Sequence, residues 1–174
     1  MTFTLPALKN LGSLADVRPT IVVDSREQAP LRFLRLESVT GSLASGDYSF
    51  AGGEHLFAVE RKSIPDLVSS VCTQERERFE RELHRLRGFR FARLLIVGTR
   101  EEIETGSYRS QAKPKSVLNS LAAFEARYSV PVVFAPTPTV AAAQIESWAY
   151  WCAREVVEAA NELLKGHKRV QRAG

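Results

Sequence analysis

Residues 46–62 read GDYSFAGGEHLFAVERK, two runs rich in aromatic and β-branched residues on either side of a glycine pair. Such side chains suit the pleated surface of a strand, and a Gly-Gly pair supplies the positive φ angles that a tight turn requires. The segment therefore predicts a β-hairpin with a two-residue turn at Gly52 and Gly53.

Alternating side chains along this hairpin predict one face that carries charge. With the turn at Gly52 and Gly53, Asp47 lies opposite Ala58 and shares a face with Glu60 and Lys62. Asp47 and Glu60 are then diagonal neighbours, whose carboxylates can reach one cation. Carboxylates suit Mg²⁺ or Mn²⁺, and such an ion beside an ammonium suits phosphodiester hydrolysis. The alternative is a solvated hairpin face with no chemical role.

Three blocks of the sequence read IVVDSRE at residues 21–27, GDY at residues 46–48 and VERKSIPD at residues 59–66. Together they resemble the nuclease domain of the XPF family of structure-specific DNA endonucleases. Their order and spacing match the family's V-D-x-R-E, G-D-Y and V-E-R-K-x-x-x-D motifs, and the likeness covers roughly residues 20–135. The resemblance implies a restriction-endonuclease-like fold, which is an α/β/α sandwich around a central mixed β-sheet.

The same resemblance implies a set of site residues. The catalytic residues would be Asp24, Asp47, Glu60 and Lys62, with the three acids as metal ligands. The supporting residues would be Arg26, Glu27, Arg61, Asp66 and Arg78. The resemblance also implies Mg²⁺ or Mn²⁺ as cofactor, DNA as substrate, and action as a homodimer.

Some of these residues have competing structural explanations. Asp66 stands three residues after Ser63 at a helix start, which is the spacing of a capping box. Asp24 also fits a turn aspartate after a short strand. Arg78 opens RFERE at residues 78–82, a loose match to the family's R-L-x-x-Q element with Glu82 at the glutamine position.

The rest of the chain predicts a mixed sheet with helices on both sides. Strands are expected at 21–24, 92–98 and 130–135, with a strand or extended loop at 34–39. Helices are expected from residue 63, at 74–87, as a short turn from 99, at 114–128 and at 139–165. The strand, helix, strand order after the hairpin predicts a parallel crossover beside the antiparallel pair.

Residues 106–115 form a polar, basic loop with one aromatic residue. Arg109, Lys113 and Lys115 are candidates for contacts with DNA phosphates, and Tyr108 is a candidate for stacking on a base. The alternative is a solvated connector.

The chain is long enough for one domain with a substantial core. We expect an N-terminal arm at 1–18, a nuclease core at 19–137, and a C-terminal helix with a basic tail at 138–174. The leucine spacing in the arm fits a short helix clamped on the domain or an arm that reaches a partner. The C-terminal helix belongs to the same domain and is a candidate dimer interface, because it carries both tryptophans. The basic tail either adds nonspecific DNA affinity or is frayed.

Charge, cysteine spacing and hydropathy narrow the class of protein that this chain can be. A net charge of +4 and a pI near 9.3 fit a polyanionic partner. Cys72 and Cys152 are too far apart in sequence to suggest a zinc site or a disulfide framework. The sequence shows no membrane-spanning run and no signal peptide, so we expect a cytoplasmic protein, or a nuclear one in a eukaryote.

These observations predict a divalent-metal-dependent DNA endonuclease that acts on branched or structured DNA in repair or recombination. The alternatives are a catalytically inactive DNA-binding or scaffold subunit of the same fold, and an exonuclease. Family members that cut branched DNA usually carry a tandem helix-hairpin-helix module after the nuclease. These residues show none, so we expect a helicase or another DNA-binding partner to supply that function.

Overall fold

The computed structural model describes residues 18–72 and 74–173, with side chains described as far as residue 166. The strands are β1 (Ile21–Asp24), β2 (Ser38–Gly41), β3 (Tyr48–Phe50), β4 (Phe57–Ser63), β5 (Phe91–Val97) and β6 (Val132–Ala135). The helices are α1 (Ile64–Cys72), α2 (Arg76–Leu86), α3 (Arg100–Glu104), α4 (Pro114–Tyr128) and α5 (Pro138–Ala173). No helix in the described ranges is long and apolar enough to cross a membrane.

The strands form one mixed sheet in the order β2-β1-β3-β4-β5-β6. The pairs β1–β3 and β3–β4 are antiparallel, whereas β1–β2, β4–β5 and β5–β6 are parallel. The two parallel pairs at the β5–β6 side are joined through helices, as crossover connections require. The predicted mixed sheet is therefore confirmed.

The hairpin of β3 and β4 has a different register from the one that the glycine pair predicted. Tyr48 pairs with Val59, two residues beyond the expected partner, and residues 51–56 form a wider loop. Of the two glycines, only Gly52 has a positive φ, of 81°, and a Cβ at Gly53 would collide with the ring of Phe50. Asp47 immediately precedes β3 and donates its backbone N–H to the Val59 carbonyl at 2.8 Å. Because a shift of two residues preserves the faces of a strand, Glu60 keeps the face that the sequence predicted.

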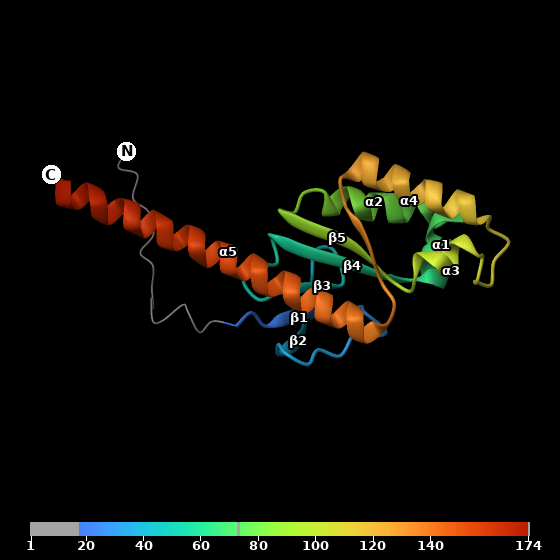
Figure 1. The fold of residues 1–174 in the computed structure, drawn as a ribbon, viewed down its shortest axis with the longest axis horizontal. Coiled ribbons are helices and arrows are strands. Elements are labelled where there is room, and N and C mark those ends of the chain that lie inside the picture. The colour runs from blue at the N-terminus through green and yellow to red at the C-terminus, as the bar shows by residue number, and fades with distance from the viewer. Residues whose placement is uncertain (1–17, 73, 174) are drawn as a thin grey trace.

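Helices cover both faces of the sheet, as Figure 1 shows. On one face, α1, α2 and α4 bury an apolar cluster over Ala58, Leu94 and Ile96. On the other face, α5 packs over Tyr48 and Leu95 through Ile145 and Ala149. The acids of the hairpin lie on the first face, beside α1 and α2.

The helix α5 has 36 residues and is longer than the sequence predicted. At a rise of 1.5 Å per residue its length is about 54 Å. Its packing on the sheet extends to Cys152 and Ala153, and its C-terminal half projects beyond the sheet (Figure 1). The predicted N-terminal arm falls almost wholly outside the described residues, and so do the side chains of the basic tail beyond Lys165.

Candidate active site

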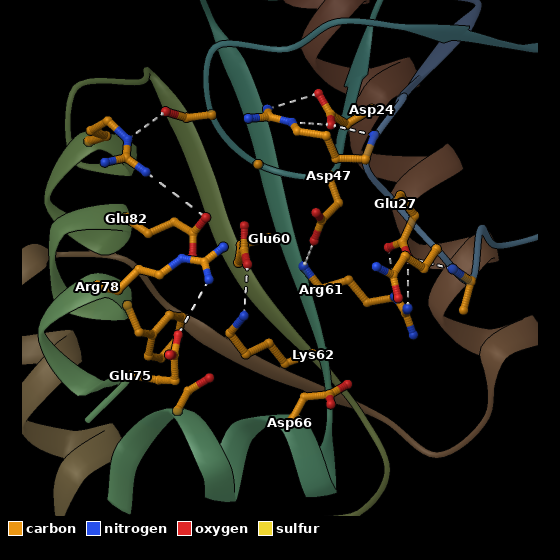
Figure 2. A pocket seen from close by; sticks show the side chains of 18 of the residues that line it. Asp24, Glu27, Asp47, Glu60, Arg61, Lys62, Asp66, Glu75, Arg78 and Glu82 are labelled. Carbon is orange, nitrogen blue, oxygen red and sulfur yellow. Dashed lines mark hydrogen bonds and ion pairs between the residues drawn. The ribbon is translucent and has the colours of Figure 1, made fainter. Parts of the chain in front are cut away.

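A cleft of about 540 Å³ lies where β1, β4, α1, α2 and the loop before β3 meet. All nine catalytic and supporting residues that the resemblance implied line this cleft: Asp24, Arg26, Glu27, Asp47, Glu60, Arg61, Lys62, Asp66 and Arg78. Figure 2 shows their side chains and the contacts between them. The fold therefore brings together residues that are scattered over more than fifty positions of the chain.

Asp47, Glu60 and Lys62 form the centre of the cleft. The Nζ atom of Lys62 donates to Oε1 of Glu60 at 3.0 Å, and it lies 4.7 Å from the centroid of the Phe79 ring. Asp47 accepts the backbone N–H of Arg61 through Oδ2 at 2.7 Å. Within the described residues, no cationic side chain lies within ion-pair distance of Asp47. The partly buried Lys62 thus faces more negative charge than it neutralises.

This imbalance appears in the pKa values of the three groups. Burial raises the pKa of Asp47, and the charges of Glu27 and Glu82 raise it further. Burial and the neighbouring Asp47 carboxylate raise the pKa of Glu60. Burial acts to lower the pKa of Lys62, but the Glu60 carboxylate outweighs it and the pKa is raised. Bringing a cation to these carboxylates would favour their charged forms.

Asp24 lines the cleft and accepts four hydrogen bonds. Its Oδ1 accepts the backbone N–H of Arg26 at 2.9 Å and the Arg26 Nε at 2.7 Å. Its Oδ2 accepts the Arg26 Nη2 at 3.1 Å and the Leu43 backbone N–H at 2.7 Å. Hydrogen bonding to Arg26 lowers the pKa of Asp24 to about 2. These four hydrogen bonds hold the Asp24 carboxylate in place.

The structure does not gather Asp24, Asp47 and Glu60 into one ligand set, and their role as metal ligands stays a prediction. In the described ranges, no group of three or more His, Cys, Asp or Glu side chains is placed to hold one metal ion. Asp24 instead anchors Arg26, which also donates to the Leu43 carbonyl at 2.8 Å. The Asp24–Arg26 pair therefore holds the loop that precedes Asp47.

Glu27 and Arg61 lie on the opposite side of β4 from Glu60 and form a buried ion pair. The Arg61 Nε and Nη2 donate to the two Glu27 oxygens at 3.1 and 3.0 Å. The Arg61 side chain is 14% exposed and the Glu27 side chain is 6% exposed. Tyr48 donates its hydroxyl to the same carboxylate at 3.3 Å. Both charges are satisfied, so this pair supports the site by fixing β4 to the segment after β1.

Asp66 has the capping role that its spacing suggested. Its backbone N–H donates to the Ser63 Oγ at 3.2 Å, and the same hydroxyl donates to the Asp66 Oδ2 at 2.6 Å. Arg78 stands at the mouth of the cleft with a side chain that is 76% exposed, and it pairs with Glu75. Neither residue contacts Asp47 or Glu60 through any hydrogen bond between described residues.

Glu82 is the functional candidate to which sequence reasoning gave little weight. It follows Arg78 by one helical turn and projects from α2 into the cleft (Figure 2). Its charge raises the pKa of Asp47, Glu60 and Lys62. The sequence signal that could have identified Glu82 was its spacing of four residues from Arg78. This spacing places both side chains on one face of α2, next to its apolar stripe.

The basic loop lies outside the cleft. Arg109, Lys113 and Lys115 are exposed, and Lys113 is the N-cap residue of α4. Tyr108 is half-buried against the core and donates its hydroxyl to the Ala112 carbonyl at 2.9 Å. The ring of Tyr108 thus packs partly against the core, and its stacking on a base stays a prediction.

The raised pKa values of Asp47 and Glu60 predict that stability falls as the pH rises. A carboxyl with a higher pKa in the folded state contributes fully below its ordinary pKa of about 4, and that contribution is lost as the pH rises through the folded value. Asp24, whose pKa is lowered, acts in the opposite sense, between about pH 2 and pH 4. We expect the Tm in EDTA to decrease from about pH 5 to pH 8. The Asp47→Asn variant should show a smaller decrease, and a wild-type Tm that rises over this range would contradict the charge assignment.

Comparisons with known proteins point to one family. The family model described as the ERCC4 domain matches residues 23–147. The structure of XPF from Aeropyrum pernix is 23% identical with a TM-score of 0.61, and the match covers 75% of this chain and 60% of that one. The structure of XPF from Aeropyrum pernix in complex with DNA is 24% identical with a TM-score of 0.62, covering 79% and 66%. The chain thus spans less than two thirds of either relative, and no curated protein sequence matches it. These similarities confirm the restriction-endonuclease-like α/β/α fold.

Proposed function

Because the chain belongs to the ERCC4 domain family, whose members are nucleases, we propose that it is a divalent-metal-dependent DNA endonuclease acting on branched or structured DNA. The observation that carries this proposal is the convergence of Asp47, Glu60 and Lys62 in one cleft. The relative solved in complex with DNA supports DNA as the substrate.

The residues of the cleft fit a hard divalent cation. Mg²⁺ commonly uses one or two carboxylates and completes its shell with water and substrate phosphate. Asp47, which has no cationic partner among the described residues, and Glu60 would supply the two carboxylates. When bound, the ion would polarise the phosphodiester and lower the pKa of its water.

The remaining side chains serve substrate binding and charge balance. Lys62 presents an ammonium where negative charge grows on the phosphorus as the bond is cleaved. Glu60 keeps that ammonium charged and in place. Arg26, held at the rim by Asp24 with a side chain that is 71% exposed, has the geometry to contact a phosphate.

A panel of labelled DNA substrates tests this function. Flaps, forks, junctions, linear duplex and single strands would be incubated with Mg²⁺, Mn²⁺ or EDTA. We expect cleavage at internal positions of branched substrates with either metal, and none in EDTA. Stepwise loss of nucleotides from ends would instead identify an exonuclease. Binding without cleavage in both metals would identify an inactive subunit.

We further propose that the protein acts as a homodimer through α5. Tyr150, Trp151, Val156 and Leu163 are exposed on this helix, and aromatic residues are enriched at protein interfaces. Light scattering should give a mass twice the 19.4 kDa of one chain, and Trp151→Glu should shift it to that of one chain. The helicase partner and the cytoplasmic or nuclear location stay predictions.

A further inference from the structure

A second groove, of about 410 Å³, lies across α2 from the cleft, and we call it the α4 groove. It is lined by Arg76, Lys113, Lys115, Ser116, Asn119 and Ser120, with no acidic and no aromatic residue. The cleft, by contrast, is lined by seven acids and five bases. The two hollows therefore differ in the sign of their charge.

Arg76 forms a rigid wall of the α4 groove. Its Nε donates to Glu80 at 2.8 Å, and its Nη1 donates to the Val71 carbonyl and to the Ser120 Oγ, each at 2.9 Å. Its guanidinium also lies 5.0 Å from the centroid of the Phe124 ring. These contacts join α1, α2 and α4, so the groove keeps its shape.

Lys113 and Lys115 carry charge that nothing nearby offsets. Both are exposed, and neither forms an ion pair with any described residue. Residues 105–124 contain no acid at all. The flanking acids are engaged elsewhere, since Glu104 pairs with Arg100 at 2.7 Å and Glu125 accepts the Val132 N–H at 2.9 Å.

The difference in charge between the cleft and the α4 groove limits which surface can bind DNA. A cleft with an excess of carboxylates repels a polyanion until a cation binds, so affinity for DNA has to come from another surface. We propose that the α4 groove binds backbone phosphates of a duplex arm that runs from the cleft across the first turn of α2. This inference rests on the proposed function for its substrate, and it adds a phosphate-binding surface outside the catalytic cleft.

The geometry also indicates where along the duplex the contact falls. Arg76 lines the α4 groove, while Glu75 and Arg78 line the cleft, so one helix separates the two. A helix with side chains is about 10–12 Å across, which corresponds to roughly three base pairs at 3.4 Å each. Lysine, serine and asparagine side chains without an aromatic platform suit phosphate contacts that do not depend on sequence.

Salt-dependent binding tests the proposal without any cleavage. Fluorescence anisotropy with a labelled duplex in EDTA would be measured from 50 to 200 mM salt. The Lys113→Ala, Lys115→Ala double variant should weaken binding roughly tenfold at the low-salt end and reduce the slope of log K against log salt by about 2. Because both lysines are exposed, we expect its Tm to match that of the wild type.

Two matched variants make the test specific. The Lys113→Arg, Lys115→Arg variant keeps both charges and should keep the wild-type slope. Arg32→Ala removes an exposed cation from the segment that packs beside α5, and it should also keep the slope. A double alanine variant with the wild-type slope would overturn the proposal. Since this assay contains no metal, a chain that binds through the groove but never cleaves would refute the nuclease function alone.

Discussion

Replacing Lys62 with methionine should lower the single-turnover rate of DNA cleavage by roughly 10²–10³-fold while leaving DNA binding largely intact. Lys62 places its ammonium 3.0 Å from Glu60 and beside Asp47. Methionine preserves the length and the packing against Phe79 but removes the charge. Glu60 would then face Asp47 and Glu82 without its cation, so its pKa would rise further and its carboxylate would be a poorer metal ligand.

Cleavage at saturating protein concentration measures this effect apart from binding. Lys165→Met is a matched control, because Lys165 forms an exposed pair with Glu162 on α5 and lies far from the cleft in sequence. We expect this control to cleave at the wild-type rate. Wild-type cleavage by Lys62→Met would show that the ammonium has no part in the reaction.

Replacing Asp47 with asparagine should have the larger effect, a loss of roughly 10³-fold or more in cleavage with Mg²⁺, as expected when the charge that stabilises a transition state is removed. The amide oxygen can still accept the Arg61 N–H that Asp47 accepts at 2.7 Å, so the hairpin should fold normally. The substitution removes a carboxylate that forms no ion pair with any described cationic side chain. A single-turnover assay over a range of Mg²⁺ concentrations would measure the loss.

Glu54→Gln provides the control for the Asp47 variant. Glu54 is exposed in the loop of the same hairpin, so its substitution removes an acid without touching the cleft. We expect wild-type cleavage from it. If Asp47→Asn cleaves as fast as Glu54→Gln, the assignment of Asp47 fails.

The sequence predicted the face of the hairpin correctly although it predicted the register wrongly. The glycine pair suggested the tightest turn, but the Phe50 ring packs against Gly53 and widens the loop. The observed register differs from the predicted one by two residues, which is an even number. An odd shift would turn Tyr48 or Val59 away from the α5 side of the sheet, where both are buried. The pattern of apolar residues therefore fixed which side chains face the cleft, while the turn alone did not fix their pairing.

The sequence could not predict which hydrogen-bond or ion-pair partner each charged side chain contacts. Asp24 and Arg26 are two residues apart, and their side chains pair with each other through two hydrogen bonds. Glu82 reaches the cleft because α2 packs beside β4, a long-range arrangement that no local pattern contains. Tyr108 looked like an exposed aromatic residue in a basic loop, yet tertiary packing buries half of it.

The carboxylates of Asp47 and Glu60 weaken the fold at neutral pH. Partly buried carboxylates with raised pKa values destabilise the folded state at neutral pH, since their charged forms lack compensation. Groups perturbed in this way cluster at functional sites. Glu27 and Arg61 also line the cleft, and their complete pairing shows the arrangement expected of charges with a structural role.

Binding of Mn²⁺, followed by electron paramagnetic resonance as the free ion disappears, tests most directly whether Asp47 and Glu60 hold a metal. The wild-type chain should bind Mn²⁺ in competition with Mg²⁺. The Asp47→Asn, Glu60→Gln double variant, shown by circular dichroism to be folded, should leave the ion free over the same range. Equal binding by the two proteins would contradict the account.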